Sequence, residues 1–249
     1  HDLSIDLGRT ERLAQCIPSG KVIVSESGIR DNATVRRLGS HAHAFLVGSH
    51  LTSQRDIDRA ARDLVFGRNK VCGISTSSTA QAARAAGARY GGLIIAPDSP
   101  RSVSRETAHH IVAAEPGLDY VAVTRSTDVN ELKRLADIPG LHAFQLHAPF
   151  QGDLEGERQL LRRAREAAGS LDIWRAVNMR EADFAALSGQ PFPEVEALVL
   201  DSGNGGTGTR FDWSTIPTEV KSTSFLAGGL HIGNLDEALS LSLIHISEP

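Results

Sequence analysis

The chain has 249 residues, of which 41% are hydrophobic and 22% are charged, a balance typical of a globular protein with a large core. Its net charge of −4 gives no field that would attract nucleic acid or an anionic membrane. Two cysteines exclude a disulfide framework, and no apolar run has the length of a membrane span or the pattern of a signal peptide. We therefore expect a cytoplasmic protein without nucleic-acid or membrane partners.

Short apolar runs alternate along the chain with longer stretches that carry apolar residues at helical spacing. The pattern predicts nine strands, at residues 22–24, 44–47, 70–74, 92–95, 120–123, 143–146, 173–176, 197–200 and 224–227. Helices are predicted between them, among others at residues 78–86, 105–114, 129–135 and 154–168. Apolar strands joined by helical crossovers indicate a parallel sheet covered on both faces, either a closed (β/α)8 barrel or an open doubly wound sheet.

Nine strands are one more than a single (β/α)8 barrel holds, so a boundary is expected. We place it after the charged helix at 55–64, which gives a first unit of residues 1–68 and a second of residues 69–241. The second unit then has seven strands and lacks the eighth. Residues 242–249 fit a barrel poorly, and we interpret them as a non-native tail, such as a translated adapter read-through. The chain does not begin with Met, which suggests a fragment.

Two residues at predicted strand ends are candidates for acid–base chemistry, because barrel active sites form at the carboxyl ends of the strands. Cys72 closes the first strand of the second unit, although a buried strand Cys is more often an inert small hydrophobe. Asp201 ends a later strand beside the glycine-rich loop 202–208, where it is a candidate general acid or simply a turn cap.

Further polar groups follow other strands of the second unit. Arg101 follows the second predicted strand of this unit and suits a carboxylate, although a solvated surface Arg is the ordinary alternative. Gln145 is placed to reach a ligand at the barrel mouth. Gly228 and Gly229 follow the seventh strand, where barrels frequently bind phosphate through backbone amides.

The first unit has two small-residue loops after consecutive strands. They resemble a phosphate site with an acid or base beside it, and turn chemistry alone explains them equally well. The residues concerned are Glu26, Ser27, Gly28, Gly48 and Ser49.

The ordered motifs of the second unit resemble the phosphoribosylanthranilate isomerase family from about residue 69 to residue 237. The set is far more specific than any single member. It comprises KVCGI at 70–74, YGGLI at 90–94, SPR at 99–101, QLH at 145–147, VLD at 199–201, GGTG at 205–208, FDW at 211–213 and LAGGL at 226–230.

The first unit resembles the end of indole-3-glycerol phosphate synthase, through HDLSID at 1–6, VSESGI at 24–29 and FLVGS at 45–49. The order of the two matches a bifunctional fusion of tryptophan biosynthesis, here truncated at both ends, and explains the ninth strand. By this resemblance the first unit keeps ligand-binding loops of a partial carboxy-lyase domain, and we expect no synthase activity from it.

The resemblance implies an Amadori rearrangement of N-(5-phosphoribosyl)anthranilate, a small phosphorylated substrate, to an aminodeoxyribulose phosphate. It implies that Cys72 is the general base, that Asp201 is the general acid, and that Arg101 holds the anthranilate carboxylate. Gln145 would contact the substrate, and Gly228 and Gly229 would bind part of the phosphate. No cofactor and no metal are expected, and the full-length protein is expected to be a monomer.

Two alternatives stay open at this point. One is an inactive fragment that binds a phosphorylated ligand or serves only as structure. The other is a different phosphate-binding barrel isomerase, for example of histidine biosynthesis; such enzymes typically use paired aspartates, which the Cys at residue 72 argues against.

Overall fold

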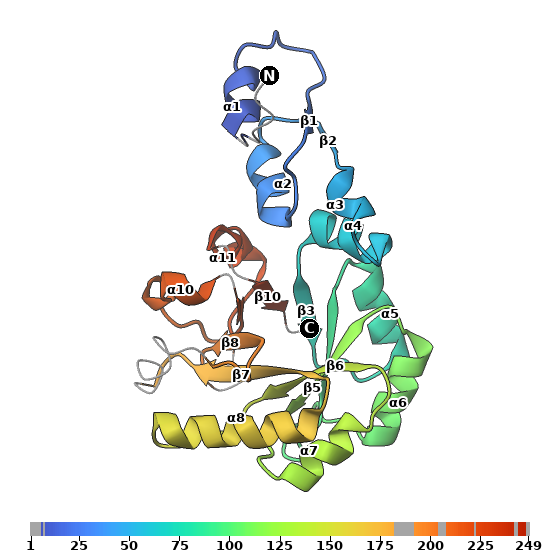
Figure 1. Ribbon diagram of the computed structural model, residues 1–249, viewed down its shortest axis with the longest axis vertical. Coiled ribbons are helices and arrows are strands. Elements are labelled where there is room, and N and C mark those ends of the chain that lie inside the picture. The colour runs from blue at the N-terminus through green and yellow to red at the C-terminus, as the bar shows by residue number, and fades with distance from the viewer. Residues whose placement is uncertain are drawn as a thin grey trace. The chain divides into compact units, whose positions relative to one another are not determined.

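A computed structural model describes residue 6 and residues 8–181, 192–203, 208–221, 223–241 and 244–247. The chain divides into two compact units, His1–Gly67 and Arg68–Pro249. Figure 1 shows the elements of both units.

The first unit consists of two parallel strands and the helices around them. The helices are α1 (Gly8–Ala14), α2 (Asn32–Leu38), α3 (Ser49–Thr52) and α4 (Ile57–Phe66). Strands β1 (Val24–Glu26) and β2 (Ala44–Leu46) pair through Val24↔Ala44 and Glu26↔Leu46, so their carboxyl ends lie at the same edge. β1 begins two residues later than the sequence predicts.

The second unit is a closed barrel of parallel strands, in the order β10-β3-β4-β5-β6-β7-β8-β9. Its first seven strands lie where strands are predicted, and they confirm the (β/α)8 fold class. They are β3 (Asn69–Cys72), β4 (Tyr90–Ile94), β5 (Asp119–Thr124), β6 (Leu141–Leu146), β7 (Asp172–Asn178), β8 (Ala197–Asp201) and β9 (Ser224–Leu226).

The eighth position of the ring is filled, which corrects the expectation that it is empty. The strand β10 (Ile244–Ser247) pairs with β9 through Ile244↔Phe225 and with β3 through Ile246↔Lys70. The physical reason is that an extended segment satisfies the backbone groups that β9 and β3 would otherwise leave as unpaired edges. Among the described residues, β10 is the last element of the barrel.

The helices of the barrel begin where the sequence supplies a capping side chain. Thr76, Ser104, Asp128 and Asp153 each accept a hydrogen bond from a backbone N–H of the first helical turn. The capped helices are α5 (Ser77–Ala85), α6 (Arg105–Ala114), α7 (Val129–Ala136) and α8 (Leu154–Ala168), which lie outside the strand ring in Figure 1. Shorter elements flank β9: η1 (Trp213–Thr215), α10 (Thr218–Lys221), η2 (Ile232–Asn234) and α11 (Leu235–Ser240).

Alternate strand residues face the barrel interior and the helix layer, because side chains along a strand point to opposite faces. Inside the barrel, Trp174 stacks on Phe225 with ring centroids 4.2 Å apart, and it meets Tyr90 edge to face at 5.0 Å. These rings fill the interior toward the amino ends of β4 and β7. The space at the carboxyl ends is thereby left to smaller and polar side chains.

A buried ion pair fixes the carboxyl end of β6. Arg175 of β7 donates through Nε and Nη2 to both carboxylate oxygens of Glu157 on α8, each at 2.9 Å. Its Nη1 donates to the carbonyl of Ala148 at 2.7 Å, just after β6. The pair therefore ties the loop that follows Gln145 and His147 to the helix layer.

Within the part of the chain that the structure describes, none of the helices combines the length and the apolar character required to cross a membrane.

The role of β10 can be tested by ending the chain at Leu241. Five register pairs connect β10 to its neighbours, and at about 1 kcal/mol net for a backbone hydrogen bond their loss should lower the free energy of unfolding by roughly 3–5 kcal/mol. Denaturant unfolding measures the loss, and amides of β3 and β9 should exchange with solvent faster. A full-length Ile246→Pro variant should show the same exchange pattern, because proline removes a ladder donor. Unchanged unfolding and exchange in both would contradict the place of β10 in the barrel.

Candidate active site

Cys72 lies at the carboxyl end of β3 with its side chain inside the barrel, where it is 6% exposed. The alternating burial of β3 turns Lys70 and Cys72 inward and Val71 toward the helices. The strand is followed by Gly73, whose φ of +90° suits glycine. The N–H groups of Gly73 and Ile74 both donate to the carbonyl of Gly92 on β4, at 2.9 and 3.0 Å. The position of the thiol is therefore fixed by backbone on two strands.

Lys70 is a residue of this site that the sequence analysis does not single out. It is fully buried, and its Nζ donates to Cys72 Sγ at 3.2 Å and to Gln145 Oε1 at 2.8 Å. The signal in the sequence is a lysine two positions before Cys72 on an otherwise apolar strand, which puts both side chains on the same face. The ammonium group joins β3 to β6 across the interior.

Gln145 continues the chain of polar contacts to His147. Its Nε2 lies 2.5 Å from Nε2 of His147. Burial, and after it the positive charges of Lys70, Arg175 and Arg125, together lower the pKa of His147 from 6.5 to about 3. His147 is therefore neutral at physiological pH, and its Nε2 accepts a hydrogen bond from the Gln145 amide. That leaves the amide oxygen of Gln145 turned toward Lys70.

Arg101 lies in the loop between β4 and α6, with its side chain over Gly73. A Cβ atom placed on Gly73 would be 3.3 Å from Arg101 Nη1 and 3.4 Å from its Cδ. The guanidinium group is thus next to the residue that follows Cys72. Arg101 is partly exposed, so a ligand at the barrel mouth can reach it.

Asp201 lies at the carboxyl end of β8, where it is 6% exposed. A Cβ atom placed on Gly228, just beyond β9, would be 2.7 Å from Asp201 Oδ1 and 2.6 Å from Ser202 Oγ. Glycine is therefore required at position 228 for the two loops to approach. The Ser202 hydroxyl donates to Asp201 Oδ1 over a long 3.4 Å.

The Gly228–Gly229 turn has left-handed backbone at both residues, with φ of +79° and +68°. A Cβ atom on Gly229 would meet the backbone nitrogen of Arg210 at 2.8 Å, so this turn lies against the loop after Asp201. Asn234 Nδ2 donates to the Gly229 carbonyl at 2.8 Å and so fixes the turn to η2. Residues 205–207 of the predicted glycine-rich motif lie outside the described residues.

The predicted residues of the second unit form two groups at the same mouth. Lys70 joins Cys72 to Gln145, with Arg101 beside them, and Asp201 lies against Gly228. In the ring, β9 and β10 separate β8 from β3, so the two groups stand at different positions around the rim. All the strands are parallel, and both groups follow carboxyl ends.

The predicted residues of the first unit also follow strand ends. Ser27 and Gly28 come after β1 with φ of +71° and +78°, and Glu26 is exposed beside them. Gly48 precedes α3, which begins at Ser49 after β2. Because β1 and β2 are parallel neighbours, the two loops lie at the same edge.

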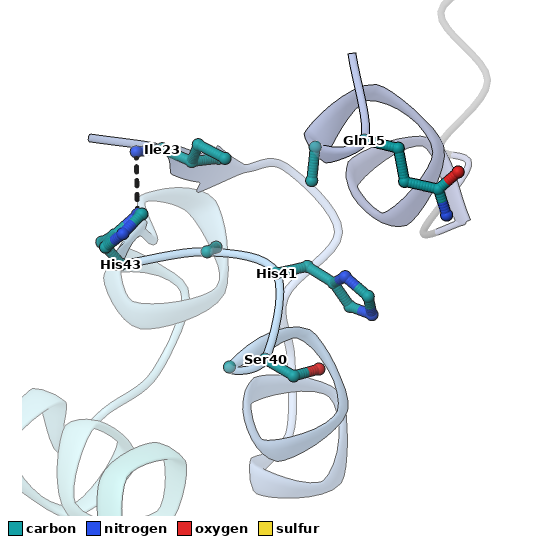
Figure 2. A pocket seen from close by; sticks show the side chains of 8 residues that line it. Gln15, Ile23, Ser40, His41 and His43 are labelled. Carbon is teal, nitrogen blue, oxygen red and sulfur yellow. Dashed lines mark hydrogen bonds between the residues drawn. The ribbon is translucent and has the colours of Figure 1, made fainter. Parts of the chain in front are cut away.

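A surface pocket of about 300 Å³ in the first unit lies at the other end of these strands. Figure 2 shows Gln15, Ile23, Ser40, His41 and His43 around it, with the Ile23 N–H donating to His43 Nδ1 at 3.1 Å. Ile23 and His43 precede β1 and β2. The pocket is therefore separate from the predicted loops.

The family profile of N-(5'phosphoribosyl)anthranilate (PRA) isomerase matches residues 69–246, and that of indole-3-glycerol phosphate synthase matches residues 1–64. The chain is 51% identical over 242 residues to the "Tryptophan biosynthesis protein TrpCF" of Corynebacterium glutamicum, covering 97% of this chain and 50% of that protein. It is 39% identical over 238 residues to the protein of that name from Salmonella typhi, covering 95% and 50%. The chain thus spans about half the length of these curated relatives.

Solved structures give the same answer for the barrel. A phosphoribosyl anthranilate isomerase from Thermus thermophilus matches with a TM-score of 0.60 and 28% identity, over 73% of this chain and 86% of that chain. The isomerase from Thermotoga maritima matches with a TM-score of 0.57 and 26% identity, with the same coverage. Both resemblances inferred from the motifs are confirmed. The chain belongs to the PRA isomerase family, with a segment of the indole-3-glycerol phosphate synthase family preceding its barrel.

Proposed function

We propose that the second unit catalyses the rearrangement of N-(5-phosphoribosyl)anthranilate to 1-(2-carboxyphenylamino)-1-deoxyribulose 5-phosphate. The observation that carries the proposal is the position of Cys72 and Asp201, both inside the mouth of one barrel at carboxyl ends of strands. The family supports the same chemistry. Ring opening needs a proton delivered to the furanose oxygen while another leaves carbon, so it requires two groups of opposite function.

In the proposed reaction, Asp201 acts first in its acid form. Its proton goes to the ring oxygen as the C1′–O bond breaks, and the anilino nitrogen supplies the electron pair that forms the C1′=N⁺ bond. The sulfur of Cys72 then takes the proton from C2′. The C–H electron pair becomes the C1′=C2′ double bond, and the nitrogen recovers its pair. The enol so formed becomes the ketone when C1′ gains a proton and the C2′ hydroxyl loses one.

The surrounding residues orient the substrate in this proposal. Arg101 binds the anthranilate carboxylate, because a guanidinium group matches a carboxylate in shape and charge. The backbone amides at Gly228 and Gly229 bind part of the phosphate, since barrels frequently use the loops after their last strands in this way. The first unit contributes synthase-like loops at Glu26, Ser27, Gly28, Gly48 and Ser49, and we propose no reaction for it.

Replacing either proposed acid–base group tests the assignment. Cys72→Ser and Asp201→Asn should each lower kcat by about 10²–10⁴-fold, because general acid–base catalysis contributes that much. Cys16→Ser is the matched control, since Cys16 is an exposed free thiol of the first unit and its loss should leave kcat unchanged. The measurement is the rate of substrate consumption by the purified chain.

Two outcomes would count against the assignment. Turnover that survives both substitutions would remove Cys72 and Asp201 from the mechanism. A parent chain that binds a reduced product analogue in a calorimetric titration, but shows no turnover, would favour the alternative of a fragment that binds ligand only.

Arg101→Met should raise KM by roughly 10- to 100-fold, since a hydrogen bond to a charged group contributes about 1.5–3 kcal/mol. The effect on kcat should be smaller, because the carboxylate is bound in the ground state as well as in the transition state. Arg105→Met, which removes an exposed guanidinium at the start of α6, serves as the control. Equal KM values for the two variants would show that Arg101 does not hold the substrate.

The pH dependence of kcat/KM tests the state of His147. Because burial holds its pKa at about 3 instead of 6.5, the ring is neutral throughout the range from about pH 5 to 9. The parent chain and His147→Asn should therefore have pH profiles of the same shape, even if the variant is slower overall. A limb near pH 6.5 that disappears in His147→Asn would show that His147 ionises in the working range.

A further inference from the structure

The ammonium group of Lys70 is fully buried and has no carboxylate partner among the described residues. Its hydrogen bonds go to Gln145 Oε1 and to Cys72 Sγ. Moving an isolated ammonium ion out of water costs several kcal/mol unless a counter-charge or a full set of acceptors replaces the water. A neutral amide oxygen supplies only part of that compensation. Among the described residues, the other group that Lys70 Nζ contacts is the sulfur of Cys72.

We propose that Lys70 holds Cys72 as a thiolate and thereby prepares it to act as the base. A thiol sulfur is a weak hydrogen-bond acceptor, whereas a thiolate is a full negative charge and a strong one. A cation beside a cysteine favours the thiolate, which is the reactive form. The ion pair itself follows from the contacts of Lys70, while its meaning for catalysis rests on the proposed isomerase function.

The neighbouring side chains Gln145 and His147 set the hydrogen-bond contacts of the Lys70 ammonium group. Lys70 donates to Oε1 of Gln145, so the amide NH₂ is the end that faces Nε2 of His147, which a neutral ring can present as an acceptor. A protonated His147 would instead donate from Nε2 and turn the amide around, placing its NH₂ group against the ammonium. The burial that keeps His147 neutral therefore keeps the contacts of Lys70 in order.

Gly92 provides the space in which the pair forms. A Cβ atom at this position would lie 2.9 Å from Cys72 Sγ and 2.9 Å from Lys70 Nζ. Both atoms thus rest against the bare backbone of β4, and any larger residue would force one of them to move. The requirement explains the second glycine of the YGGLI motif by geometry.

In the proposed reaction, the thiolate of the ion pair takes the C2′ proton directly. The S–H bond forms from a sulfur lone pair as the C2′–H bond breaks, and no proton has to leave Cys72 beforehand. Lys70 keeps its proton throughout, so it is a positioning residue that acts through Cys72. After the step the ammonium faces a neutral thiol, and this favours return of the thiol proton to solvent.

The test measures the ultraviolet absorbance of thiolate at neutral pH in a Cys16→Ser background, so that Cys72 is the only thiol. This chain should show one thiolate equivalent, and adding Cys72→Ser should abolish it. Lys70→Met should abolish it too, and should slow alkylation by iodoacetamide by about tenfold or more, since few free thiols ionise at neutral pH. Circular dichroism reports whether each variant is folded.

Two matched substitutions at position 145 test the same proposal with Lys70 left in place. They give an answer even if the Lys70→Met chain fails to fold. Gln145→Glu supplies a carboxylate as an alternative counter-ion, so the thiolate absorbance should fall. Gln145→Met supplies none, and the absorbance should remain. A purely structural role for Lys70 predicts no such difference.

The proposal is overturned if the folded Cys16→Ser chain shows no thiolate absorbance at neutral pH. It is equally overturned if the absorbance persists in folded Lys70→Met, or if the two Gln145 variants give the same value. None of these readouts uses substrate. Absent turnover with an intact thiolate signal would therefore count against the proposed function, and turnover without that signal would count against the ion pair alone.

Discussion

A closed ring of parallel strands sends every strand's carboxyl end to one mouth, and the candidate site depends on this constraint. Cys72, Gln145 and Asp201 are far apart in the sequence, yet each lies at or near the carboxyl end of its strand. The aromatic rings of Tyr90, Trp174 and Phe225 fill the interior toward the other end. The same ring therefore supplies a packed core at one level and a set of polar side chains at its mouth.

Much of this arrangement follows from the sequence, because it rests on local signals. Strand and helix periods place the elements of the barrel within a few residues of where they lie, and capping side chains such as Ser104 and Asp153 set where the helices begin. Residues 244–247 are the exception. The sequence analysis sets them aside as part of a non-native tail, whereas in the structure they form a strand that pairs with β9 and β3.

The candidate site, too, is predicted in part from local sequence and depends in part on tertiary structure. Cys72 and Asp201 stand out because chemistry-bearing residues end apolar strands, while Lys70 reads as a strand residue whose charge has no obvious use. The place of Lys70 in the site becomes clear only in the structure, where Oε1 of Gln145 on β6 lies 2.8 Å from the Lys70 ammonium group. The low pKa of His147 is likewise a property of burial among three cations, which the sequence does not reveal. The roles assigned to these residues stay predictions.

The proposed reaction requires that one substrate span the mouth from Cys72 to Asp201. A crystal structure of the chain with a reduced product analogue tests this most directly. We expect the sugar chain to lie between Cys72 Sγ and the Asp201 carboxylate, with the anthranilate carboxylate on Arg101 and the phosphate on the backbone amides at Gly228 and Gly229. An analogue bound elsewhere, or bound at the mouth without contact to Cys72 and Asp201, would contradict the account.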